Sequence, residues 1–164
     1  MKLIPITLLA LLSSVLCTVS GEEPENILRN GDFEKGGGWK GDGRIVQDST
    51  SEQNKVYVVA LGSKEKEFSQ SVNIDRKTSK VTVKFRARPS KDYKPKNSAI
   101  AGLVVRSRGA KIGLISECSF EDLGQWRGYS FSYECAGAKE VTIQVQVRPG
   151  EGSVEFDDFV MTEH

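Results

Sequence analysis

Apolar and polar side chains alternate with a period of two along much of this chain. The clearest alternation spans residues 81–88, whose apolar positions are Val81, Val83, Phe85 and Ala87. Such alternation places apolar side chains on one face of a β-strand and polar ones on the other. Further alternating or β-branched runs predict strands over residues 56–61, 68–74, 101–106, 111–118, 129–135, 141–148 and 154–161. No segment between these runs has the periodicity of an amphipathic helix.

The predicted strands are short, and glycine, proline, asparagine and serine fill the turns between them. Residues 36–38 and 90–97 have the composition of longer loops. Because each strand has one apolar face, two antiparallel sheets packed face to face would bury all of those faces together. We therefore predict an all-β fold, a two-sheet antiparallel β-sandwich of the jelly-roll type.

The first twenty residues have the pattern of a secretory signal peptide. Lys2 precedes an apolar stretch over residues 3–16, and the small residues Thr18 and Ser20 stand just before a cleavage point. The stretch is shorter than the ~20 apolar residues that span a membrane. The pattern predicts a signal peptide at residues 1–20.

Removal of that segment would leave residues 21–164, a length that suits one domain. We expect this domain to be secreted or periplasmic, without membrane insertion. Two alternatives remain open: an uncleaved N-terminal membrane anchor, and a lipoprotein anchored through Cys17.

The charge balance and the residue inventory exclude several classes of function. Lys and Arg total 23 against 22 Asp and Glu, for a net charge of +1, so no basic patch for nucleic acid is expected. The single histidine, His164, excludes histidine-dependent triads and multi-histidine metal sites. The chain also lacks a G-x-S-x-G motif, a P-loop and a dinucleotide-binding glycine motif. We expect no catalytic residues.

Two cysteines would remain after loss of the signal peptide. Cys118 and Cys135 both fall on the apolar face of a predicted strand. In an oxidising compartment they could form a disulfide, and two buried free thiols are the alternative.

The two ends of the domain carry its most distinctive motifs. Residues 26–36 read Asn-Ile-Leu-Arg-Asn-Gly-Asp-Phe-Glu-Lys-Gly and are followed by Trp39, and residues 154–160 read Val-Glu-Phe-Asp-Asp-Phe-Val. Together with Gly-Gln-Trp-Arg-Gly-Tyr at 124–129, they resemble the carbohydrate-binding modules of families 4, 9 and 22 and the wider galactose-binding-like jelly rolls. The resemblance covers essentially residues 21–164.

The resemblance also implies that the termini meet and share a structural calcium ion. Ca²⁺ binds six to eight oxygen ligands from carboxylates and carbonyls. Glu34 and Asp157 would each supply a carboxylate, and Asp32 a backbone carbonyl. Alternatively, Asp32 only stabilises its turn and Asp157 is solvated.

Polar strand faces and one loop aromatic are the candidate ligand contacts. Amide and guanidinium groups offer donors and acceptors in a fixed plane, which suits sugar hydroxyls. Trp39 and Trp126 are interpreted as core residues, whereas Tyr93 stands in a loop with no evident core to enter. The candidate residues are Arg86, Tyr93, Gln144, Gln146 and Arg148. An ordinary solvated sheet face is the alternative reading.

We therefore predict an exported, non-catalytic module that binds a polysaccharide or glycan on one sheet face. The main alternative is an envelope or extracellular protein-interaction or structural module with the same fold and no sugar specificity, because fold does not determine function. A small jelly-roll hydrolase is a third hypothesis, which the lack of a base–nucleophile pair disfavours.

Overall fold

The computed structural model describes residues 25–96, 101–107, 115–118, 120 and 122–164. The predicted signal peptide lies outside these residues. In the part that the structure describes, no helix has the length and apolar character needed to cross a membrane.

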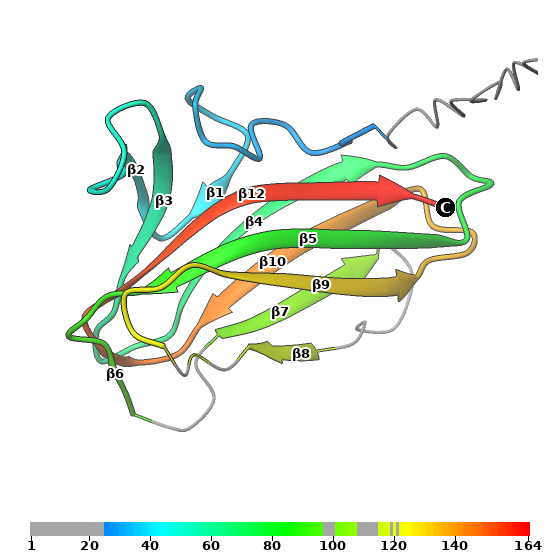
Figure 1. Cartoon of the computed structure of the whole chain (residues 1–164). Coiled ribbons are helices and arrows are strands. Elements are labelled where there is room, and N and C mark those ends of the chain that lie inside the picture. Colours follow the sequence, from blue (N-terminus) through cyan, green and yellow to red (C-terminus); the bar gives the residue numbers. More distant parts are fainter. Residues whose placement is uncertain (1–24, 97–100, 108–114, 119, 121) are drawn as a thin grey trace, which may run out of the picture.

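Two five-stranded antiparallel sheets form the molecule (Figure 1). Sheet A has the order β1 (Lys40–Gly41), β4 (Lys66–Asn73), β10 (Glu140–Val147), β7 (Ala101–Ser107) and β8 (Ile115–Cys118). Sheet B has the order β2 (Arg44–Gln47), β3 (Lys55–Ala60), β12 (Ser153–Glu163), β5 (Lys80–Pro89) and β9 (Arg127–Glu134). A short pair, β6 (Lys94–Pro95) with β11 (Gly150–Glu151), is separate from both sheets. The predicted two-sheet antiparallel sandwich is confirmed.

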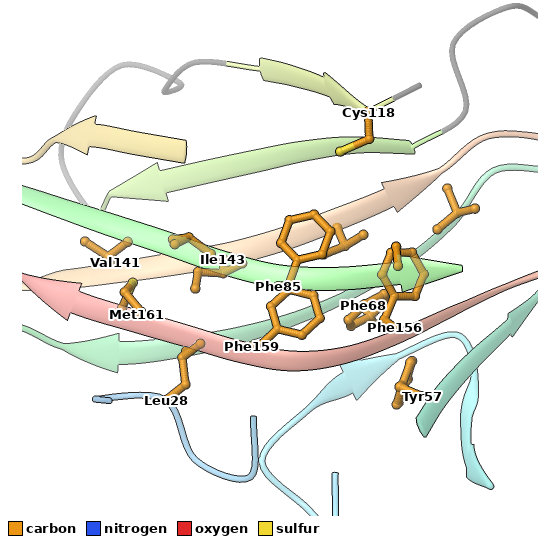
Figure 2. Packing of buried hydrophobic residues seen from close by; sticks show 14 of the residues in the cluster. Leu28, Tyr57, Phe68, Phe85, Cys118, Val141, Ile143, Phe156, Phe159 and Met161 are labelled. Atoms are coloured by element: carbon orange, nitrogen blue, oxygen red, sulfur yellow. The ribbon is translucent and has the colours of Figure 1, made fainter. Parts of the chain in front are cut away.

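The core lies between the two sheets and follows the alternation read from the sequence. Each of Val81, Val83, Phe85 and Ala87 is at most 3% exposed, as expected for one face of β5. The rings of Phe85 and Phe159 stack with their centroids 4.8 Å apart, and Figure 2 shows them side by side in the cluster. Burial of these aromatic and β-branched side chains is the main stabilising contribution to the sandwich.

The strands that the sequence did not predict are the short ones. β1, β2, β6 and β11 have two to four residues, too few for an alternation to be recognised. Of the strand predicted over 111–118, the described part is β8, and residues 111–114 lie outside the described residues.

The N-terminal segment lies against β12, so the two ends of the domain meet as the resemblance implied. The amide of Ile27 donates to the carbonyl of Met161 at 3.0 Å, and the amide of Phe159 donates to the carbonyl of Gly31 at 2.9 Å. Next to this contact the pairing of β12 with β5 shifts register between Asp157 and Val160. Asp158 within this bulge has a φ of 53°, a left-handed conformation that is uncommon for residues other than glycine.

Of the two alternatives for the cysteines, the structure shows the free thiols and not the disulfide. Cys118 lies opposite Ala101, which pairs with Val147 at the end of β10. Cys135 precedes the start of β10 and donates its amide to Ser79 at 2.8 Å. The eight residues of β10 therefore separate two ends of the sandwich, about 20 Å apart at the usual rise per residue. A disulfide needs Cα atoms within about 7 Å, and both cysteines are buried free thiols.

Candidate functional site

Polar side chains cover the outward face of sheet A along β4 and β10. Because Phe68, Val141 and Ile143 point into the core, the alternate positions point outward. The register places Thr142 opposite Ser71, Gln144 opposite Ser69, and Gln146 opposite Glu67. We call this surface the polar face; it consists of Glu67, Ser69, Ser71, Asn73, Thr142, Gln144, Gln146, Arg148 and Glu117.

Contacts between neighbouring side chains order the polar face. The hydroxyl groups of Ser71 and Thr142 are 2.7 Å apart, and the amide nitrogen of Gln144 donates to the carboxylate of Glu67. At the β8 side, Nη2 of Arg148 lies 3.3 Å from Oε1 of Glu117. These contacts hold amide, hydroxyl, carboxylate and guanidinium groups in defined positions before any ligand binds.

A hollow of about 640 Å³ adjoins the polar face at the edge of β4. Ser69, Ser71 and Asn73 form one wall of it, and Trp39 and Arg29 lie among the residues of the other. We call this hollow the β4 groove; Lys40 and Glu140 also line it. The groove and the polar face share three residues of β4 and are therefore continuous.

Trp39 is held firmly at the groove. Its indole nitrogen donates to the carbonyl of Asn30 at 3.1 Å, and its ring centroid is 4.7 Å from that of Phe159. Its interpretation as a core residue is therefore correct in part, since the half-buried ring also lines the groove. The groove could not be predicted from the sequence, because the residues that form it lie far apart in the chain. The tryptophan in the N-terminal motif was the one available signal.

The side chain of Gln70 joins the N-terminal segment to the β4 edge. Its Oε1 accepts the amide of Arg29 at 2.7 Å, and its Nε2 donates to the carbonyl of Arg29 at 2.9 Å. A buried amide that makes both bonds fixes the segment as a strand partner would. The groove is consequently built on ordered backbone.

Of the predicted ligand contacts, Gln144, Gln146 and Arg148 lie together on the polar face, where Gln146 and Arg148 are half-buried and Gln144 is only 8% exposed. Arg86 does not, because β5 belongs to sheet B and its outward side chains point away from sheet A. The Arg86 guanidinium instead lies 2.9 Å from Asp157 and 5.1 Å from the centre of the Trp126 ring.

The prediction that Tyr93 projects from an exposed loop is wrong. Tyr93 is 5% exposed, and its ring packs edge-on to Phe120 at a centroid distance of 6.0 Å. The β6–β11 pair folds this segment back over the end of the sandwich. Burial also raises the pKa of the phenol, so Tyr93 is a core residue with no face free for a ligand.

The carboxylates predicted to hold calcium have other partners and do not match what the ion requires. The carboxylate of Glu34 accepts the amide of Lys55 at 2.7 Å, and the carboxylate of Asp157 accepts Asn54 at 3.0 Å and Arg86 at 2.9 Å. Asp32 is exposed, and its carboxylate faces the Glu34 amide at 3.4 Å. Within the described ranges no three His, Cys, Asp or Glu residues are grouped for a metal. Calcium itself stays a prediction, but this donor set does not fit it.

No protein-family model and no curated protein matches the chain. Solved structures do match it. A family 61 carbohydrate-binding module in complex with β-1,4-galactotriose has a TM-score of 0.65 and 18% identity, covering 85% of this chain and 99% of that one. A family 16 module has a TM-score of 0.63 and 14% identity, covering 84% and 100%. The chain has the jelly-roll fold of carbohydrate-binding modules.

A family 22 module, the xylan-binding domain from Paenibacillus barcinonensis, extends the comparison. It has a TM-score of 0.59 and 12% identity, covering 81% of this chain and 91% of that one. These similarities agree with the resemblance read from the terminal motifs. Because the sequence identities are low, these similarities establish the fold of the chain alone.

Proposed function

We propose that this protein is a non-catalytic carbohydrate-binding module that holds a polysaccharide or glycan on the polar face and in the β4 groove. The observation that carries the proposal is the continuous surface of ordered amide, hydroxyl and charged groups beside one half-buried tryptophan. The protein shares its fold with a module solved in complex with β-1,4-galactotriose and with a xylan-binding domain, which supports the same function.

The polar face suits ligands that are rich in hydroxyl groups. The amides of Gln146 and Asn73 offer both hydrogen-bond donors and acceptors. The hydroxyl groups of Ser71 and Thr142 can donate or accept, because the hydroxyl hydrogen rotates. Because the hydroxyl groups of Ser71 and Thr142 already contact each other, little side-chain entropy of these two residues is lost on binding. The ring of Trp39 adds an apolar surface at the groove for the C–H face of a pyranose.

The acids of the polar face already have partners, which supports binding without catalysis. Glu67 accepts a hydrogen bond from Gln144, and Glu117 pairs with Arg148. A glycosidase needs one carboxyl group to act as a proton donor and a second to act as nucleophile or base. Neither acid is left free for such a role.

Binding to a panel of insoluble polysaccharides and a glycan array, with purified protein, tests the proposal. We expect saturable binding to at least one glycan, with the double variant Gln146→Ala/Arg148→Ala weakened about tenfold or more by the loss of two half-exposed hydrogen-bonding groups. Lys84→Ala, on the outward face of sheet B, is the matched control and should bind as the wild type does. Equal binding by all three proteins would exclude the polar face as the site.

The second candidate function is a protein-interaction or structural module of the cell envelope. One observation favours it: among the described residues, the only exposed large hydrophobic side chain is Leu123, so the polar face has no fully exposed aromatic platform. Folded protein that binds no glycan in the panel would support this candidate. For either function we propose export, secreted or periplasmic, which N-terminal sequencing of the mature protein would test.

A further inference from the structure

Asp157 is a buried carboxylate that needs a positive charge close to it. Its side chain is 0% exposed. Its Oδ1 accepts the amide of Asp158 at 2.8 Å, and its Oδ2 accepts both Asn54 and Arg86. Arg86 is therefore the cation that contacts this buried carboxylate, and a buried charge without a paired counter-charge is costly.

Arg86 is held in place from three sides. Its Nη2 lies 2.9 Å from Asp157, its Nε lies 2.6 Å from a carboxylate oxygen of Asp158, and Trp126 covers its plane at 5.1 Å. The Nε contact is an ion pair without hydrogen-bond geometry. The bulge in β12, with Asp158 in a left-handed conformation, is what brings two consecutive carboxylates to one guanidinium.

Lys55 makes the corresponding contacts to the N-terminal segment. Its amide donates to the carboxylate of Glu34 at 2.7 Å, and its Nζ donates to the carbonyl of the same residue at 2.9 Å. Asn54, the preceding residue, is the one that donates to Asp157. Residues 54 and 55 thus connect the N-terminal segment to β12.

We propose that Arg86 and Lys55 supply, as fixed side-chain cations, the positive charge that joins the N-terminal segment and β12, so that this centre is independent of calcium. Side-chain cations at these carboxylate and carbonyl groups would repel a divalent ion from the same oxygens. The protein then needs no metal to keep its termini together. The proposal does not rest on the proposed sugar site: the polar face lies on sheet A, and only the β4 groove shares the N-terminal segment.

Thermal unfolding of the purified protein with about 5 mM CaCl₂, and with excess chelator, is the first test. A bound ion at 100 times its Kd would raise the melting temperature by several degrees. We expect the two melting temperatures to agree within about 1 °C. A calcium-dependent rise of several degrees, with one-site binding by calorimetry, would overturn the proposal even if no variant were folded.

Variants of the two cations are the second test. We expect Arg86→Gln to lower the melting temperature by about 5–10 °C, because it leaves a buried carboxylate without its counter-charge. The double variant Arg86→Gln/Asp157→Asn should recover most of that loss, since a neutral amide needs no cation. Lys55→Gln should also lower the melting temperature, by a few degrees. Lys84 is an exposed cation on the same strand as Arg86, and Lys84→Gln should leave the melting temperature unchanged. An Arg86→Gln protein as stable as the wild type would contradict the role of the guanidinium.

Discussion

At the residue scale, the most consequential feature outside the proposed sugar site is a buried charge cluster around Arg88. Arg88 is 6% exposed; its Nη2 lies 2.7 Å from Asp48 and its Nε donates to Glu155. Nη1 donates to the hydroxyl of Thr50 at 3.2 Å, and Trp126 covers the guanidinium at 4.6 Å. The alternation over residues 81–88 puts Arg88 on the outward face of its strand, but Asp48 and Thr50 contact it there and help to bury it.

This cluster predicts an acid-sensitive contribution to stability. Burial disfavours the charge on Asp48, but hydrogen bonds from the Thr50 amide and from Arg88 outweigh it and lower the pKa of the carboxyl from 3.8 to about 2. Because the folded-state pKa is depressed, the contribution is present above about pH 4 and is lost as the pH falls toward 2. It amounts to about 2 kcal/mol.

Urea denaturation at about pH 6 and pH 2.5 measures this contribution. The wild type should lose about 1.5 kcal/mol more unfolding free energy between the two pH values than Asp48→Asn does, because part of the contribution persists at about pH 2.5. Asp122→Asn, at an exposed position, is the control and should follow the wild type. Parallel pH profiles for Asp48→Asn and the wild type would show that Asp48 does not titrate as described.

At the scale of elements, the decisive contact is the one between the N-terminal turn and β12. A Cβ added at Gly31 would lie 1.9 Å from the carbonyl oxygen of Phe159, so only glycine allows this approach. The contact places Trp39 at the groove and Glu34 beside Lys55. The close approach of Gly31 to Phe159 thus explains, through packing, why glycine stands in the Asn-Gly-Asp motif that contributed to the resemblance.

Two alanine substitutions in the N-terminal segment test whether the close approach of Gly31 to Phe159, rather than the flexibility of glycine in general, matters for stability. Gly31→Ala should lower the free energy of unfolding by about 2–4 kcal/mol, because two backbones must move apart. A Cβ at Gly36 meets nothing within 4 Å, and Gly36→Ala should therefore change stability by less than about 1 kcal/mol. Chemical denaturation of both variants makes the comparison, and equal effects would contradict the contact.

At the scale of the whole molecule, the sandwich keeps its two thiols apart and out of solvent. Cys118 and Cys135 are 2% and 4% exposed, and burial raises the pKa of Cys118 to about 12. Burial raises the pKa of Cys135 as well, so the reactive thiolate form of both residues is disfavoured in the folded protein.

Alkylation followed by peptide mass spectrometry checks this arrangement. In folded protein at about pH 8 we expect no modification of either cysteine. In denatured protein both should be modified without a reducing agent. Modification that required prior reduction would show that the two are bonded, contrary to their positions at opposite ends of β10.

The sequence alone determined most of the longer strands, the buried face of those that alternate with a period of two, and the sandwich that they form. It could do so because the period-two alternation is a local property, which each strand carries within its own residues. It also placed Gln144, Gln146 and Arg148 on one outward face, because they share the parity of a single strand. The terminal motifs indicated correctly that the two ends meet.

Only the tertiary structure decided which of these polar positions come together. Sheet order and the way loops fold back decide the separation of Arg86 from Gln144 and the burial of Tyr93 and Arg88. They also decide the formation of the β4 groove and the distance between the two cysteines. Such contacts join residues far apart in the chain, and no local pattern encodes them. The cations beside Glu34 and Asp157 belong to the same class: Lys55 and Arg86 become their partners only when β3, β5 and β12 lie side by side in sheet B.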